Sequence, residues 1–253
     1  TQVNLFVNTL LATGEGTGAV SWLAYAFRLM YLPIGLFGVS VATAVLPVVS
    51  RHAAAGNRAA IRETLSHGLG LMLMLNVPAS VGLIVLATPI VQLLFERGQF
   101  GPADTAATAA AVQMYAVGLI GYSTARIVSP VFYAIGLSRV PVFVSIGSMI
   151  ANTVASVVLV SAIGFRGLAL GTAVAALAHG GAALWLLRRH IDGIAGVRLA
   201  SRFARILAAS AVMAAAGMAA ERGMASVAPG NSLVVQGVRL GAAIGVGLVA
   251  LAA

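Results

Sequence analysis

Long apolar stretches alternate with short polar connections along the whole chain. The stretch Ala19–Ser50 is almost wholly apolar, and about 20 such residues suffice for a helix to cross a bilayer. The apolar runs lack the period-two alternation of barrel strands, so we predict an all-α, polytopic membrane helix bundle. We predict about eight transmembrane helices, over residues 1–13, 19–50, 68–94, 105–127, 142–163, 168–187, 203–219 and 233–253.

Polar residues, glycines and prolines predict where these stretches end. Pro78 and Pro89 lie inside the third stretch and predict bends, because proline removes a backbone hydrogen bond from a helix. Ser129-Pro130 predicts a break after the fourth stretch, because a residue before proline disfavours the helical conformation. We predict connections at residues 51–67, 95–104, 129–141, 192–202 and 220–232, the last with a turn at Pro229–Asn231.

Arginine is distributed unequally between the two sets of alternate connections. All fifteen basic residues are arginine, and eight of them fall in one set against three in the other. Cytoplasmic connections carry an excess of basic residues, so the richer set is predicted to be cytoplasmic. The net charge of +9 is scattered between apolar spans and forms no continuous face, so we expect no nucleic-acid partner. The richer set consists of Arg51, Arg58, Arg62, Arg139, Arg188, Arg189, Arg198 and Arg202.

Composition excludes an ordinary soluble protein and gives no support to catalysis. Hydrophobic residues make up 60% of the chain and charged residues 8%, whereas a soluble domain carries about 25% charged residues. There is no cysteine for disulfides or thiolate metal sites, and no metalloprotease or phosphate-loop motif occurs. The glycines at 14, 16 and 18 lack the strand–helix context of a nucleotide loop. We therefore expect a transporter or a structural membrane protein, with no cofactor and no enzymatic activity.

Arg28 is the strongest candidate for a functional residue. It lies about 14 Å along the helix from Ala19, at a depth where arginine costs about 2.5–3.5 kcal/mol to insert. We expect Arg28 to bind an anion, because its planar guanidinium donates paired hydrogen bonds to phosphate and never loses its charge. Tyr25 and Leu32 share its helical face and are predicted to wall the cavity. The alternative is that Arg28 snorkels to the membrane surface.

Arg126 is a second candidate, at the end of the fourth stretch. Its position fits either an interfacial anchor or a substrate ligand. Four further polar residues lie within apolar spans, where such side chains commonly join membrane helices by hydrogen bonds. These residues are Asn8, Asn152, Ser156 and Thr172. Two small-residue patterns, Gly167-x-x-x-Gly171 and Gly237-x-x-x-Gly241, favour close helix packing.

The second stretch carries the motifs YAFRLMYLP at 25–33, GLFGV at 35–39 and AVLP at 44–47. This signature resembles that of the MurJ/MviN lipid II flippases, within the wider superfamily of multidrug and polysaccharide exporters. Further matches are LFERGQF at 94–100, YAVGL at 115–119, PVFYA at 130–134 and RVP at 139–141. The resemblance extends from residue 2 to about residue 190, and beyond that rests on hydropathy and helix number.

The resemblance implies a fourteen-helix transporter of the bacterial cytoplasmic (inner) membrane that moves lipid-linked peptidoglycan precursor by alternating access. It implies that this chain is a fragment: residues 1–190 form the second six-helix transport lobe, with a truncated first helix, and residues 191–253 the terminal helix pair. Arg28 falls on the cavity arginine of the family, which meets the substrate head group. The implied partners are lipid II, membrane lipids and the missing N-terminal lobe of the same protein.

The chain departs from the family pattern in its acidic residues. Phe27 stands where the family usually has an acid, before the signature arginine. Some members bind sodium near the positions of Asn8, Asn152, Ser156 and Thr172, but no acid occurs at these positions here, and a hard cation prefers carboxylate oxygen. Three alternatives stay open: a flippase for another lipid-linked oligosaccharide, a drug–cation antiporter, and a non-transporting scaffold for cell-wall enzymes. The antiporter would need acids inside its spans, whereas the six acids of this chain all lie at or near connections.

Overall fold

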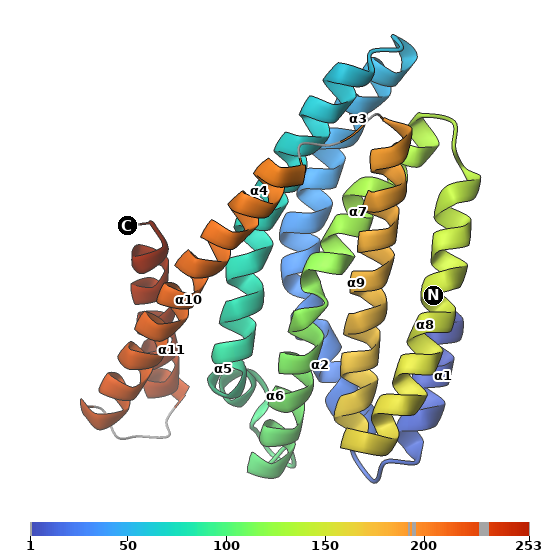
Figure 1. Cartoon of the computed structure of the whole chain (residues 1–253). Helices are drawn as coiled ribbons and strands as arrows, with labels where there is room; N and C mark the ends of the chain where they lie inside the picture. The colour runs from blue at the N-terminus through green and yellow to red at the C-terminus, as the bar shows by residue number, and fades with distance from the viewer. Residues whose placement is uncertain (1, 192, 194–195, 228–232, 253) are drawn as a thin grey trace.

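The computed structural model describes residues 2–191, 193, 196–227 and 233–252, and every regular element among them is helical. The predicted all-α class is therefore confirmed. Figure 1 shows most of the helices running side by side in one bundle, with α10 and α11 on one flank. The helices are α1 (Gln2–Thr13), α2 (Ala19–Pro33), the π-helix η1 (Ile34–Val39), α3 (Ser40–Ala54), α4 (Arg58–Val85), α5 (Ala87–Phe95), α6 (Pro102–Val117), α7 (Leu119–Ala134), α8 (Arg139–Ile163), α9 (Phe165–His190), α10 (Gly196–Val227) and α11 (Leu233–Ala252).

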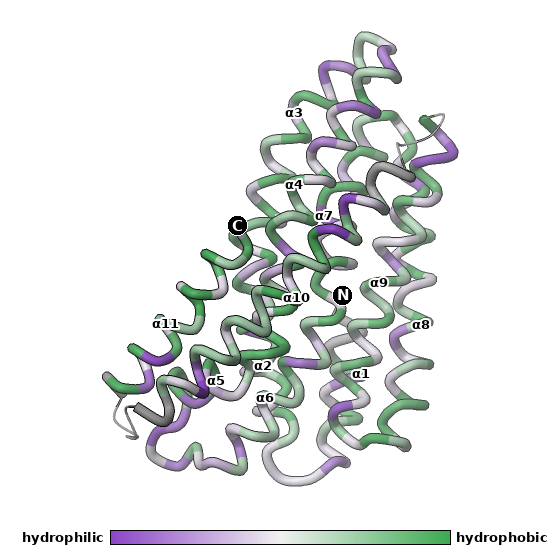
Figure 2. The backbone as a smooth tube through the Cα atoms, turned by 60° about the vertical axis from the view of Figure 1, so that its left-hand side comes forward, coloured by the Kyte–Doolittle hydropathy of each residue, from purple (hydrophilic) through white to green (hydrophobic). Residues whose placement is uncertain are grey.

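Five of the described helical stretches are long and apolar enough to cross a membrane. The remaining apolar segments are shorter or interrupted: α6 and α7, for example, meet end to end at Gly118. Figure 2 shows hydrophobic colour along most of the helices and the more hydrophilic residues mainly towards the ends of the bundle. The five stretches are Ala19–Ala54, Arg58–Val85, Arg139–Ile163, Phe165–His190 and Ala200–Met224.

A π-helix interrupts the longest of these stretches. Residues Ala19–Ala54 form one continuous helical stretch of 36 residues, and Ile34–Val39 within it have π geometry. The π segment follows Pro33 directly. Proline cannot donate to the preceding turn, and π-turns are frequent where the regular ladder is disturbed. Gly38 in this segment is buried against α7, because a Cβ there would lie 3.3 Å from Ser123 Oγ.

Two hydrophobic clusters hold the bundle together, one towards each end. The cluster at the end with the α3–α4 turn packs α3, α4, α7 and α9, with Phe132, Leu65 and Leu187 fully buried. The other cluster packs α2 against α5, α6 and α9, with Met30 and Leu168 at its centre. Burying a large apolar side chain stabilises a fold in water by about 1.5–3 kcal/mol, but in lipid the gain comes from close packing.

Glycines allow α9 to approach its neighbours closely. A Cβ on Gly121 of α7 would lie 2.4 Å from backbone atoms of Ala176 in α9, and one on Gly167 would lie 2.3 Å from Leu159 in α8. A side chain cannot occupy such a position, so the backbones touch. The pattern Gly167-x-x-x-Gly171 is thus confirmed as a packing contact. The pattern Gly237-x-x-x-Gly241 is not, because neither of these glycines has an atom within 4 Å of an added Cβ.

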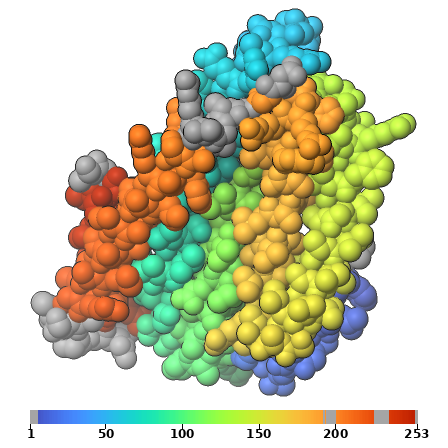
Figure 3. Space-filling model, viewed as in Figure 1, coloured from blue at the N-terminus to red at the C-terminus, as the bar shows by residue number. Residues whose placement is uncertain are grey.

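The terminal helices form a flank of their own. Helix α10 packs along α11 and crosses α4, while α11 touches α5. Figure 3 shows this pair on one side of the molecule and the α8–α9 hairpin on the other. Near the outer end of the pair, Arg239 Nη2 donates to Glu221 Oε1 at 2.8 Å and ties the two helices together.

Several predicted helix ends are wrong, because helices continue beyond the apolar stretch into polar sequence. The predicted connection 51–67 is mostly helical, since α3 runs to Ala54 and α4 begins at Arg58. Asn57 caps α4 by accepting a hydrogen bond from the Ala60 N–H at 3.0 Å, as capping asparagines do. The predicted break at Ser129-Pro130 does not occur: α7 continues to Ala134, and Pro130 lies inside it.

The other connections are also shorter in the structure than predicted. The polar stretch 95–104 is a genuine connection up to Gly101, after which Pro102 begins α6. The predicted linker 192–202 overlaps α10, which begins at Gly196, and the predicted connection 220–232 overlaps α10 up to Val227. Asp192 and the predicted turn Pro229–Asn231 lie outside the described residues. The third stretch is interrupted at Leu86, and both Pro78 and Pro89 are accommodated within helices.

The two sets of connections gather at opposite ends of the bundle. Figure 1 shows the α3–α4 and α7–α8 turns and the end of α9 at one end, and the α1–α2, α5–α6 and α8–α9 turns at the other. The first end carries Arg51, Arg58, Arg139 and Arg188. The arginine-rich connections therefore share one end of the bundle, and the cytoplasmic location of that end stays a prediction.

Candidate functional site

Helix α2 divides its surface between a buried face and an open one. Leu29 and Met30 are buried against α6 and α9, with exposures of 4% and 0%. Arg28 is exposed, as is Leu32 one turn later. Arg28 therefore points away from the core of this chain and is accessible to a ligand.

Tyr25 forms the base on which Arg28 lies. The guanidinium carbon of Arg28 is 5.6 Å from the centroid of the Tyr25 ring, within range of a cation–π contact. The Tyr25 ring in turn packs against Phe95 at 4.8 Å and Phe100 at 5.6 Å. These aromatic contacts come from the α5–α6 connection, so that connection fixes the ring under the arginine.

Arg126 reaches the same open face from α7. Its Nη2 donates a short hydrogen bond to the Tyr31 hydroxyl, and its guanidinium carbon is 5.8 Å from the Tyr31 ring centroid. Tyr31 lies three residues after Arg28, on the same side of α2. Arg126 thus contacts α2 about one turn after Arg28, through a residue that sequence reasoning missed. We call Tyr25, Arg28, Tyr31, Leu32 and Arg126 the arginine face.

The N-terminal end of α2 is fixed by polar contacts to α6. Trp22 Nε1 donates to Asp104 Oδ1 at 2.7 Å, and the Gly101 N–H donates to Asp104 Oδ2 at 2.9 Å. The Trp22 hydrogen bond, followed by that from Gly101, lowers the pKa of Asp104 below its ordinary value. Gly18 precedes Trp22 with φ 104°, and a Cβ there would lie 2.7 Å from the Trp22 ring. The turn therefore requires glycine.

The four predicted polar residues also meet, where α1, α8 and α9 converge. Asn8 Nδ2 and Asn152 Nδ2 donate to Thr172 Oγ1 at 3.0 and 3.3 Å. Thr172 donates to the Leu168 carbonyl at 2.8 Å, and Ser156 is fully buried beside Gly171. Asn8, Asn152 and Thr172 thus join the three helices by hydrogen bonds, as predicted, whereas Ser156 Oγ has no hydrogen-bond partner among the described residues.

The family resemblance implies a sodium site near this polar cluster. Three buried oxygens, Asn8 Oδ1, Asn152 Oδ1 and Ser156 Oγ, have no hydrogen-bond partner, and a cation could use such oxygens. However, all four side chains are uncharged, and no group of three histidine or acidic side chains gathers in the described part of the chain. The residues do not supply the charge that a hard cation prefers, so we derive no ion-coupled step from them.

The chain matches the family model described as lipid II flippase MurJ over residues 1–235. It belongs to the MurJ family. MurJ proteins are membrane transporters of bacteria and not enzymes, which agrees with the absence of catalytic motifs from the sequence. The match covers the arginine face, the polar cluster and α10, and it ends within the first turn of α11.

Curated relatives share about a third of their residues with this chain. It is 32% identical over 193 residues to the "Probable lipid II flippase MurJ" of Vibrio cholerae, covering 76% of this chain and 36% of that protein. It is 34% identical over 220 residues to the protein of the same description from Rhizobium meliloti, covering 85% and 40%. It is 35% identical over 175 residues to "Lipid II flippase MurJ" of Burkholderia cenocepacia, covering 69% and 34%. The chain therefore spans about a third to two fifths of the length of these relatives.

The fold is that of a solved MurJ structure. A "Lipid II flippase MurJ, inward closed conformation" superposes with a TM-score of 0.78 at 25% identity, covering 98% of this chain and 50% of that one. The helical bundle described here thus corresponds to half of a MurJ molecule.

Proposed function

We propose that this chain forms the second transport lobe and the terminal helix pair of a lipid II flippase. The lobe comprises residues 1–190 and the pair residues 191–253, and together they cross the membrane about eight times. In this proposal the protein moves undecaprenyl-pyrophosphate-linked peptidoglycan precursor across the bacterial cytoplasmic membrane by alternating access. The other half of the substrate site comes from the part of MurJ that lies outside the match.

The arginine face is the observation that carries this proposal. Arg28 and Arg126 lie at different heights on one open surface, and Tyr25 and Tyr31 hold their guanidinium groups. Neither arginine has an acidic partner among the described residues. In a membrane protein, charges of this kind normally face a water-filled cavity or a ligand.

The chemistry of the arginine face suits a diphosphate. A guanidinium group donates two parallel hydrogen bonds to phosphate oxygens, and such charge-assisted bonds are about twice as strong as neutral ones. In a cavity of low effective dielectric, the attraction increases further. Arg28 would bind the pyrophosphate, while Arg126 would bind charge or hydroxyl groups nearer the cytoplasm. The exposed side chain of Leu32 would contact apolar parts of the substrate.

The test replaces Arg28 in the full-length protein, as the only copy in a cell. We expect Arg28→Ala to abolish growth while membrane insertion and abundance persist, because alanine removes an insertion cost of about 2.5–3.5 kcal/mol. Arg28→Lys should restore growth only in part, because lysine keeps the charge and loses the paired geometry. Arg166→Ala is the matched control: it removes an exposed arginine that covers Phe165 at the outer end of α9, away from the arginine face.

The same experiment separates this proposal from its rivals. A scaffold for cell-wall enzymes would tolerate Arg28→Ala, so normal growth of that variant would reject the transport role of the arginine face. A flippase for another lipid-linked oligosaccharide would also need Arg28. It is distinguished by measuring translocation of lipid II in vesicles against translocation of an undecaprenyl-pyrophosphate carrying a different sugar.

A further inference from the structure

A separate cavity opens on the opposite side of α7 from the arginine face. It has a volume of about 390 Å³ and lies between α4, α7, α9 and α10. Thr124 lines it, and Thr124 and Arg126 differ by two positions, or about 200° around the helix. The cavity therefore faces away from Arg126 and is distinct from the proposed substrate site. We call it the α9–α10 crevice.

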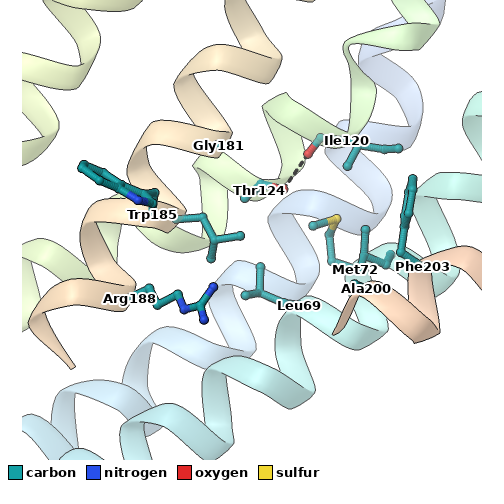
Figure 4. A pocket seen from close by; sticks show the side chains of 11 residues that line it. Leu69, Met72, Ile120, Thr124, Gly181, Trp185, Arg188, Ala200 and Phe203 are labelled. Carbon is teal, nitrogen blue, oxygen red and sulfur yellow. Dashed lines mark hydrogen bonds between the residues drawn. The ribbon is translucent and has the colours of Figure 1, made fainter. Parts of the chain in front are cut away.

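The walls of the crevice are apolar. Leu69 and Met72 of α4, Leu184 of α9 and Phe203 of α10 form most of its surface. The hydroxyl of Thr124 is its main polar group away from the opening, and that hydroxyl already donates to the Ile120 carbonyl at 2.7 Å, as Figure 4 shows. A wall of this kind suits a hydrocarbon chain and offers nothing to a polar solute.

An arginine lies at one end of the crevice. In Figure 4 the guanidinium group of Arg188 lies at the opening beside Leu69. Arg188 makes no hydrogen bond or ion pair within the part of the chain that the structure describes, and no acidic residue lines the crevice.

Trp185, at the opening of the crevice, is a residue typical of the membrane–water interface. Trp185 is half exposed and lies one turn before Arg189, whose guanidinium carbon is 3.8 Å from the centroid of its ring. Tryptophan and arginine together are typical of the membrane–water interface. The opening therefore lies at head-group level, at the arginine-rich end of the bundle, with the apolar part of the crevice extending towards the bilayer interior.

We propose that the α9–α10 crevice binds an anionic phospholipid of the cytoplasmic leaflet. One acyl chain would lie against Leu69, Met72 and Phe203, and the phosphate would accept hydrogen bonds from Arg188. Basic pockets between transmembrane helices on the cytoplasmic side are suited to such head groups. Because α10 forms one wall and α4 and α9 the others, the bound lipid joins the terminal pair to the transport lobe.

The experiment measures lipid binding to the full-length protein in detergent by native mass spectrometry, with phosphatidylglycerol and phosphatidylcholine as probes. Gly181→Phe fills the crevice without a clash, because no atom lies within 4 Å of a Cβ at Gly181. We expect it to weaken phosphatidylglycerol binding about tenfold or more, since excluding even two methylene groups has that effect. Gly147→Phe on α8 is the matched control, as Gly147 also has open space around it.

The head-group contacts are tested separately. Arg188→Ala should remove the preference for phosphatidylglycerol over phosphatidylcholine, a loss of about tenfold. The control removes one arginine at the other end, by Arg166→Ala. Equal binding of both lipids to the unaltered protein, or unchanged binding to Gly181→Phe, would overturn the proposal.

One further arm distinguishes this site from the transport pathway. Undecaprenyl pyrophosphate should leave phosphatidylglycerol binding unchanged, and Arg28→Ala should also leave it unchanged. Displacement of phosphatidylglycerol by undecaprenyl pyrophosphate would reject the phospholipid assignment and would indicate that the crevice binds the transported lipid.

Discussion

At the scale of single residues, the hydrogen bond between Trp22 and Asp104 makes the outer end of the protein sensitive to acid. The pKa of Asp104 is lowered, chiefly because Trp22 donates to its carboxylate. A carboxyl group with a lowered pKa stabilises the fold above its ordinary pKa of about 3.9, and that contribution is lost as the pH falls through the lowered value.

Trp22→Phe tests this contact. Phenylalanine keeps a ring to pack on Phe165, which lies 5.2 Å from the Trp22 ring, but it cannot donate a hydrogen bond. We expect the variant to have a lower melting temperature than the unaltered protein at pH 7, and the difference to shrink below about pH 4. Trp185→Phe serves as the control, because Trp185 faces an arginine instead of an acid. A difference that stayed constant from pH 7 to pH 3 would contradict the role given to Asp104.

Single residues also show where sequence reasoning reached the site and where it stopped. Arg28 was predicted because one charge in a long apolar stretch has few explanations. Tyr31 was missed, because a tyrosine in such a stretch reads as part of the core, and only the fold brings Arg126 to its hydroxyl. The position three residues after Arg28 was the one signal that pointed to it.

At the scale of helices, the contact between α7 and α9 depends on a missing side chain. A Cβ on Gly121 would lie 2.4 Å from the Ala176 backbone, which a flexible side chain could not relieve. We expect Gly121→Val to lower the free energy of unfolding by at least about 1–3 kcal/mol through overpacking. Gly147→Val introduces the same side chain into α8 where space is open, and should leave the melting temperature nearly unchanged. Equal melting temperatures for the two variants would show that α7 and α9 do not approach so closely.

The helical class was predictable, whereas the number and extent of the helices were not: about eight were predicted, and the described residues form eleven α-helices and one π-helix, with five stretches long enough to cross a membrane. Hydropathy marks where a chain leaves the apolar part of the membrane, whereas helices end where a cap or a glycine stops the backbone hydrogen bonds. This explains why α3 and α4 close to a short turn at Asn57, although the polar stretch around it is far longer. The break predicted at Pro130 was wrong because prolines are tolerated inside membrane helices, where neighbouring groups can satisfy the backbone groups that a proline leaves free.

At the scale of the whole molecule, orientation in the membrane is the property with the most direct test. Single cysteines are introduced into a full-length protein that has no other cysteine. The 253 residues described by this sequence contain none, so none has to be removed from them. Ala55 and Gln99 are both exposed, in turns at opposite ends of the bundle, and Ala55 spares the capping side chain of Asn57. We expect an impermeant thiol reagent to label Gln99→Cys from outside and Ala55→Cys only after the membrane is opened. Labelling of both from one side would reverse the assignment of the ends.

The sequence predicts the general architecture of the molecule well, but it does not predict how the helices cross one another. Eight apolar stretches and an arginine bias indicate a helical bundle and its orientation. They do not indicate that α10 crosses α4 or that a crevice with Arg188 at its opening lies beside it. Such features depend on the angle between helices, which small differences in side-chain volume determine.

The π-helix has a consequence for the rotational phase of the long helix that contains it. Each residue of an α-helix turns the chain by about 100°, and a π-turn holds one residue more than an α-turn. The Arg28 half is therefore rotated by about 100° relative to the half that buries Val45 and Val49, compared with an unbroken α-helix. Deleting Leu36, which is 65% exposed, should restore a regular helix and turn the arginine away from the cavity, whereas Leu36→Ala should not. If Leu36→Ala supports growth and the deletion does not, the length of this segment matters and the side chain of Leu36 does not. The π segment would then act as an angular spacer that sets the direction in which Arg28 points.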